Sequence, residues 1–161
     1  MSELPNMGIE PGMEEPVNID HLYKDPKTEE LDVEVMITKD TGHWKIIWKV
    51  GTNSEGHEVH RQLHIVREVG HDHLTNWGPY TATAEFGSLT APRVFVKNMP
   101  YPQRRSLEEI ALRTKVMAPD GVWDCQTWVR EVFAEAVKTG LLSSAESYRT
   151  LSEVERETQT S

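Results

Sequence analysis

The segment GVWDCQTWVREVFAEAVKTG, residues 121–140, carries the clearest structural signal in the sequence. Its apolar residues recur at helical spacing, namely Trp128, Val129, Val132, Phe133 and Ala136. This spacing predicts an amphipathic helix that packs on a core. Asp124 is expected to cap the start of the helix, because its carboxylate can accept an N–H of the first turn. Gly140 is expected to end the helix as its C-terminal cap.

Cys125, the only cysteine in the sequence, lies three residues before Trp128, on the inward face of the first turn. The unpaired N–H groups and the positive end of the helix dipole favour a thiolate at this place. Position alone leaves two interpretations open. Cys125 is either a nucleophile or a buried cysteine that packs as a small apolar residue.

Composition limits the function classes. The 161 residues suit one domain, and a single cysteine excludes an internal disulfide and favours a reducing compartment, so a cytoplasmic protein is expected. No apolar run is long enough to predict a membrane span. The net charge of −9 argues against nucleic acid as a partner and favours a small-molecule substrate.

Two segments, residues 43–50 and 58–69, alternate between apolar and polar residues and predict neighbouring antiparallel strands. Further short strands are expected at 33–37 and 93–97, and a helix at 106–115 that opens with a capping box at Ser106. Residues 70–92 are expected to form a long loop that could include a strand at residues 80–86. The predicted fold class is α+β, an antiparallel sheet packed on the helix that bears Cys125.

The expected organisation is a disordered leader over residues 1–28, a domain over 29–142 and a polar, frayed C-terminal tail over 143–161. The leader is rich in Pro, Glu, Gly and Met and has no periodicity. The tail is predicted from its polar, Ser- and Glu-rich composition.

A nucleophilic cysteine needs a base, and the base needs a group that orients it. The strand alternation places His43 and His60 away from the apolar stripes, on one face of the sheet. Taken singly, each is more typical of a surface histidine. A metal site at His57, His60 and His64, with His71 and His73 nearby, is less favoured, because His57 and His60 would point to opposite faces of a strand. No metal and no cofactor are therefore expected.

Three motifs carry a resemblance to a known family. The segment 43–47 (His-Trp-Lys-Ile-Ile) resembles the first histidine strand of the circularly permuted papain-like fold, 58–61 resembles its second histidine strand, and 124–129 resembles its cysteine helix opening. The order His, His, Cys is that of the lecithin:retinol acyltransferase-like group, a permutation of NlpC-type peptidases. The pattern is most similar to that of small fungal proteins with His-Trp … Cys-x-x-Trp-Val. The resemblance covers roughly residues 31–141.

The resemblance implies a thiol hydrolase or acyltransferase that acts on a small acyl or amide substrate. Cys125 would attack the carbonyl, His43 would act as the base, and His60 would orient His43. The N–H of Cys125 would contribute to an oxyanion hole. The sequence departs from the family at Asp124, which replaces an asparagine, and at Lys45, which replaces a small apolar residue.

The alternative function keeps the fold without the nucleophile. The protein would then be a non-covalent small-molecule pocket, a cyclase or isomerase of fungal natural-product biosynthesis. The five tryptophans could line such a pocket, although core packing is the more usual role for each of them. A non-catalytic interaction protein is also compatible with the sequence.

Overall fold

A computed structural model describes residues 18–39, 41–67, 74–76, 78–84, 90–116 and 125–160. The fold is α+β, as the sequence predicts. The strands are β1 (Leu31–Thr38), β2 (His43–Thr52), β3 (Glu58–Leu63), β4 (Ile65–Arg67), β5 (Leu74–Asn76), β6 (Tyr80–Thr83) and β7 (Arg93–Met99). The helices are α1 (Tyr101–Arg113), α2 (Cys125–Lys138) and α3 (Ser144–Gln159).

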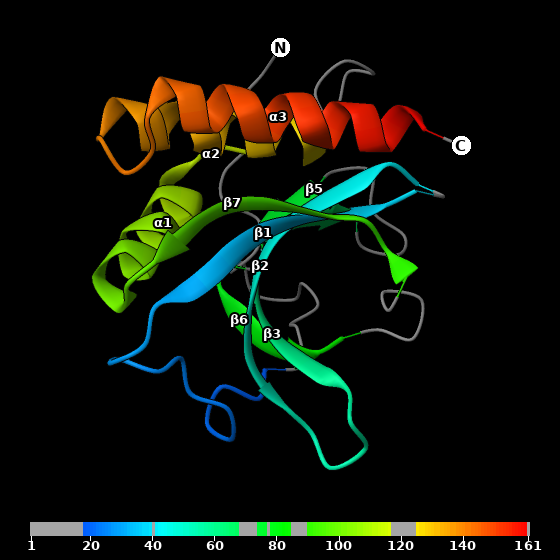
Figure 1. The fold of residues 1–161 in the computed structure, drawn as a ribbon, viewed down its shortest axis with the longest axis vertical. Helices are drawn as coiled ribbons and strands as arrows, with labels where there is room; N and C mark the ends of the chain where they lie inside the picture. Colours follow the sequence, from blue (N-terminus) through cyan, green and yellow to red (C-terminus); the bar gives the residue numbers. More distant parts are fainter. Residues whose placement is uncertain are drawn as a thin grey trace.

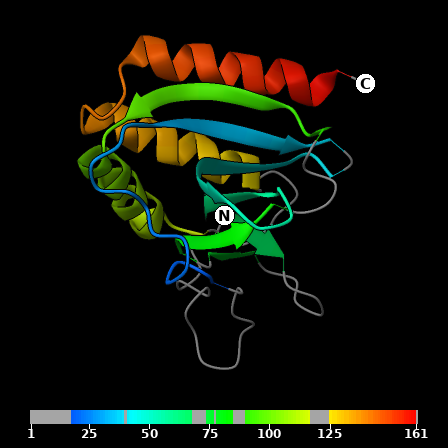
Figure 2. The same ribbon diagram turned by 60° about the horizontal axis from the view of Figure 1, so that its bottom comes forward.

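The main sheet has the strand order β6-β3-β2-β1-β7, and every neighbouring pair is antiparallel. The register shifts between Val33 and Glu34 and again between Lys49 and Gly51. Such irregularities increase the local twist of a sheet. The sheet accordingly curls, with β3 and β6 turning away from β1 and β7 (Figures 1 and 2).

The helices gather on one face of this sheet. Figure 1 shows α3 running along β7, with α2 beside it and α1 at one end. The alternating residues Trp44, Ile46 and Trp48 of β2 point into the core between sheet and helices, where each is at most 1% exposed. Trp128 of α2 meets them from the other side and is fully buried. The apolar stripes that the sequence predicts therefore form the contact that holds the two layers together.

The burial of these tryptophans bears on the proposed aromatic pocket. Trp44, Trp48 and Trp128 belong to the hydrophobic core. Trp77 and Trp123 lie outside the described residues. The described tryptophans thus serve packing rather than the lining of a cavity.

The segment 70–92, predicted as a long loop, contains β5 and β6, and β6 lies within the strand that the sequence allows at 80–86.

Two element boundaries also differ from the sequence prediction. The strand predicted over 58–69 divides at His64, and β4 pairs with β5 instead of continuing in the main sheet. Helix α1 begins at Tyr101, earlier than the predicted start at Ser106. The Ser106 hydroxyl donates to the Pro102 carbonyl within the helix, so Ser106 is not a cap. Pro102 sits in the first turn, where a missing N–H costs nothing.

The predicted frayed tail over 143–161 is wrong, because residues 144–159 form α3. Ser143 and Glu146 form a capping box at its start. Polar residues of α3 bond to the rest of the fold: the Thr150 hydroxyl donates to the Phe95 carbonyl, and the Trp44 indole donates to the Thr158 hydroxyl. The polar composition of this segment predicts a frayed tail, but hydrogen-bonding side chains as well as apolar ones hold α3 against the sheet.

Residues 18–28, the last part of the predicted leader, contact the rest of the fold instead of being disordered. The Ile19 N–H donates to the Thr81 carbonyl at the edge strand β6. Fully buried Arg104 of α1 forms an ion pair with Asp25 (3.0 Å) and donates to the carbonyls of Pro26 and Glu29. We call this set of contacts the Arg104 clasp. Residues 1–17, the first part of the predicted leader, lie outside the described residues.

Candidate functional site

The start of α2 is attached to the start of β2. The side-chain amide of Gln126 donates to the carbonyl of Gly42 at 2.8 Å. Gly42 has a φ of 69°, and a Cβ there would come within 3.2 Å of the Gln126 amide nitrogen, so glycine suits this close approach. Cys125 and His43 are the chain neighbours of these two residues, and Cys125 packs partly buried against the core. The predicted cap Asp124 lies outside the described residues.

His43 forms a hydrogen bond with His64, not with His60. The distance from His43 Nε2 to His64 Nδ1 is 2.8 Å, and His64 Nε2 lies 2.6 Å from the Tyr80 hydroxyl. The strand register explains the pairing. Leu63 lies opposite Ile46, so the next residue, His64, comes beside the first residues of β2.

The expected role of His60 as the group that orients His43 is therefore wrong. His60 lies opposite Lys49, six residues further along β2, which corresponds to roughly 20 Å of strand. Its Nε2 bonds to Glu58 at 2.9 Å instead. His64 occupies the same face in the sequence alternation, but alternation alone does not show which histidine stands beside His43.

A buried polar row continues from His64 across the sheet. The Tyr80 hydroxyl donates to Gln62 Oε1, and the Lys45 ammonium donates to the same oxygen, each at 3.2 Å. Gln62 is 3% exposed, and Lys45, His64 and Tyr80 are each 7% exposed. Polar groups this deeply buried are costly unless they are hydrogen-bonded. The face that the sequence assigns to polar residues is thus an enclosed network rather than a solvated surface.

Burial sets the protonation of these histidines. Desolvation, followed by the charges of His43 and Lys45, holds the pKa of His64 well below 6.5, so His64 is neutral near pH 7. The pKa of His60 is also lowered, mainly by desolvation, although its bond to Glu58 opposes the shift. Hydrogen bonds from His60 and Arg93 lower the pKa of Glu58 to about 2.

These shifts predict how stability depends on pH. Below pH 6.5 the unfolded chain takes up protons that buried His60 and His64 resist, so the unfolding free energy should fall as the pH drops below that value. A second fall is expected between pH 4.5 and about 2, where Glu58 is protonated only after unfolding. Urea unfolding at a series of pH values measures both. Glu58→Gln should remove part of the second fall, whereas an unfolding free energy that is constant from pH 7 to 5 would contradict the first.

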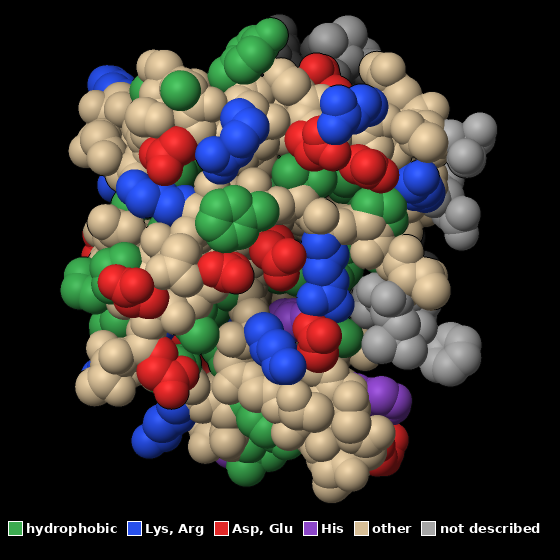
Figure 3. All heavy atoms as spheres, viewed as in Figure 1, with side chains coloured by type: hydrophobic (Ala, Val, Ile, Leu, Met, Phe, Trp, Pro, Cys, Tyr) green, Lys and Arg blue, Asp and Glu red, His purple; other side chains and the backbone are tan. Residues whose placement is uncertain are grey.

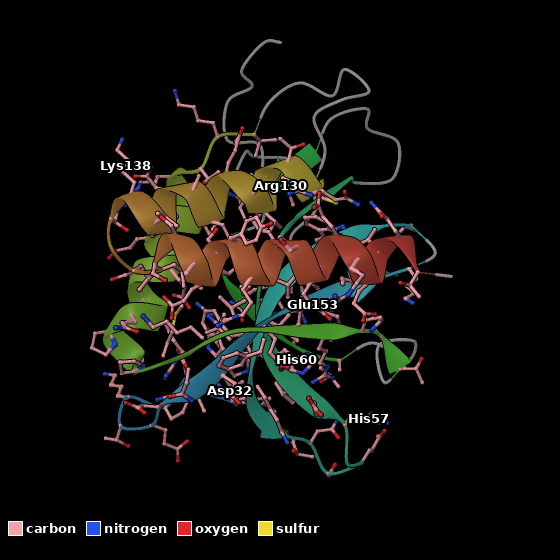
Figure 4. All side chains as sticks on the ribbon, turned by 45° about the horizontal axis from the view of Figure 1, so that its top comes forward. Asp32, His57, His60, Arg130, Lys138 and Glu153 are labelled. Carbon is pink, nitrogen blue, oxygen red and sulfur yellow. The ribbon has the colours of Figure 1, made fainter. Side chains whose placement is uncertain are left out.

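The histidines considered for a metal site do not converge. Figure 4 labels His57 near the end of the β2–β3 hairpin and His60 within the sheet, and His57 lies 3.8 Å from the Glu55 carboxylate. In the part of the chain that the structure describes, no three His, Cys, Asp or Glu side chains are arranged to hold a metal ion. His71 and His73 lie outside that part.

The surface charge is arranged in local pairs. On the face seen in Figure 3, acidic and basic side chains are interspersed. Lys97 pairs with Glu146 at 3.8 Å, and Arg130 pairs with Glu155. This face therefore lacks the continuous basic surface that nucleic-acid backbones require.

Among the helices of the described ranges, none combines the length and the apolar character needed to cross a bilayer. Comparison with family models, with curated proteins and with solved structures found no match to this chain.

Proposed function

We propose that this protein is a cysteine-dependent hydrolase or acyltransferase of the permuted papain-like type, acting on a small acyl or amide substrate through Cys125. One observation carries the proposal. A bonded histidine pair, His43 and His64, stands at the start of β2, and the Gln126–Gly42 bond ties this point to the start of α2. A nucleophile, a base and an orienting group are the parts that such chemistry needs.

The reaction would proceed in two balanced steps. His43 takes the thiol proton of Cys125, and the sulfur forms a bond to the substrate carbonyl carbon. The leaving group departs with the proton from His43, which leaves a thioester. Water or another acceptor then gives a proton to His43 and attacks the thioester, which releases the product and restores the thiol.

Two features of the site support these roles. His64 takes the place of His60 as the orienting group, because it bonds to Nε2 of His43. In this proposal Nδ1 of His43 is then the ring nitrogen that takes the thiol proton. The first-turn N–H groups of a 14-residue helix favour negative charge at its start. They stabilise both a thiolate at Cys125 and the oxyanion of the tetrahedral intermediate.

A second candidate function is a non-covalent pocket that acts as a cyclase or isomerase. The buried row of His64, Tyr80, Gln62 and Lys45 favours it, because it could bind and protonate a small molecule without a thiol. The substitution Cys125→Ala distinguishes the two functions. A pocket of this kind keeps its activity in Cys125→Ala, and an acyl-enzyme does not.

The proposal is tested by the rate at which iodoacetamide alkylates the single cysteine, measured against pH. We expect an apparent thiol pKa below the ordinary value of about 8.5. His43→Ala should move it up toward that value, since the imidazolium that stabilises the thiolate is lost. An apparent pKa at or above about 8.5 in the unmodified protein would identify Cys125 as a structural thiol.

A further inference from the structure

We propose that Lys45, Gln62 and Tyr80 are positioning residues that fix the direction of the hydrogen bonds through His64 and so hold His43 with its proton on Nε2 and a lone pair on Nδ1. The inference deepens the proposed function, because a lone pair on Nδ1 is what a base for Cys125 requires. It follows from the donors and acceptors of the buried row, taken one bond at a time.

The first step orients the Gln62 amide. An ammonium group can only donate hydrogen bonds, so the atom of Gln62 that faces Lys45 Nζ at 3.2 Å has to be its oxygen. The carbonyl oxygen of an amide only accepts. Lys45 therefore turns Gln62 so that this acceptor also faces Tyr80.

The second step sets the Tyr80 hydroxyl. Tyr80 has one hydroxyl hydrogen, and it donates that hydrogen to Gln62 Oε1 at 3.2 Å. Toward His64, whose Nε2 lies 2.6 Å away, the Tyr80 oxygen can then only accept. The proton of this short bond consequently belongs to His64 Nε2.

The third step reaches the proposed base. A neutral histidine has one N–H, so His64 with a proton on Nε2 has a lone pair on Nδ1. That lone pair accepts from His43 Nε2 across 2.8 Å. Neutral His43 with a proton on Nε2 therefore has its lone pair on Nδ1. The neutral state of His64 assumed here agrees with the effect of burial, which lowers its pKa.

Because the row is buried, the reversed direction of these hydrogen bonds is energetically unfavourable. Water could satisfy either tautomer at an exposed site, but His64, Tyr80 and Lys45 are each 7% exposed and Gln62 is 3% exposed. Reversing one bond would leave two donors or two acceptors facing each other inside the protein, which is unfavourable. The wrong histidine tautomer in a triad is known to cost on the order of 10⁴ in rate.

The test is nitrogen-15 NMR of the full chain with labelled histidine, because protonated and lone-pair ring nitrogens of neutral histidine resonate at well-separated frequencies. At a pH where both rings are neutral, we expect the proton on Nε2 in His43 and in His64. A proton on Nδ1 in either ring would overturn the inference. This readout uses no substrate and needs no variant of the row.

A matched pair of variants tests the role of Gln62. Gln62→Met keeps the volume but removes the acceptor, so Tyr80 can donate to His64, and we expect the tautomers of His64 and His43 to become mixed. Gln62→Glu keeps an acceptor oxygen, so the wild-type tautomers should persist. Alkylation of Cys125 at neutral pH should slow about tenfold or more in the methionine variant alone. Unchanged tautomers in Gln62→Met would show that the row does not set them.

The two readouts also separate this inference from the proposed function. If NMR finds the proton on Nε2 in His43 and in His64 but the apparent pKa of Cys125 is that of an ordinary thiol, the order of the hydrogen bonds is retained and the thiol mechanism is rejected. A reactive thiol together with a proton on Nδ1 of His64 would retain the mechanism and reject the order.

Discussion

Cys125→Ala is expected to lower the turnover of an activated ester, such as p-nitrophenyl acetate, on the order of 10⁴-fold or more while the fold persists. The nucleophile is the only route to the acyl-enzyme, so its loss leaves only the weak effects of binding and of the oxyanion hole. Cys125 is only partly buried at the edge of the core, so the loss of its sulfur should cost roughly 1–3 kcal/mol of stability. The measurement is steady-state ester hydrolysis, with circular dichroism to verify the fold.

Histidine variants test whether His43 and Cys125 act together. His43→Ala should be nearly as damaging as Cys125→Ala, and the double variant little worse than either, because groups that act as a unit are not additive. His57→Ala is the matched control, since His57 lies in the β2–β3 turn beside Glu55 and its side chain is 44% exposed. Turnover that survives Cys125→Ala would favour the non-covalent pocket instead.

Arg104→Met is expected to destabilise the protein by about 3–5 kcal/mol, the largest stability effect that we predict for a single polar residue. Arg104 is fully buried and makes its ion pair with Asp25, whose side chain is 12% exposed. Removal of the guanidinium leaves the Asp25 carboxylate with the Trp48 indole as a donor but without its ion-pair partner. The carbonyls of Pro26, Glu29 and Met99 lose the donor that Arg104 supplies. Urea unfolding measures the change.

Arg113→Met is the control for this variant. Arg113 pairs with Glu135 at 3.2 Å, but its side chain is 51% exposed, so its removal should cost about 0–1 kcal/mol. If the Arg104 clasp holds residues 18–28 in place, Arg104→Met should also speed tryptic cleavage after Lys24 and Lys27. Equal unfolding free energies for the two variants would contradict the role of the clasp.

The parts of the fold that are predictable from sequence are those in which local periodicity and burial agree. The helix that begins at Cys125, and the β2 stripe of Trp44, Ile46 and Trp48, follow from spacing alone. Gly140 ends α2 with a φ of 83°, as expected for a C-terminal cap. In each case the residues that set the local structure are also those that pack.

The parts that are not predictable depend on contacts between distant residues. His64 replaces His60 beside His43 because of the β2–β3 register, which alternation does not specify. Helix α3 looks like a frayed tail because its attachment depends on polar bonds, such as that from Thr150 to the β7 backbone. The Arg104 clasp joins residues nearly 80 positions apart, so no local pattern reveals it.

Formation of an acyl-enzyme on Cys125 can be measured by reacting the protein with a small activated acyl ester, quenching with acid and determining the mass of the tryptic peptide that contains Cys125. We predict one acyl group on this peptide, formed at least about 100-fold faster than in His43→Ala and lost again on incubation in water. An acyl group that forms at the same rate in both proteins, or that appears only on other residues, would contradict a base-activated thiol at Cys125.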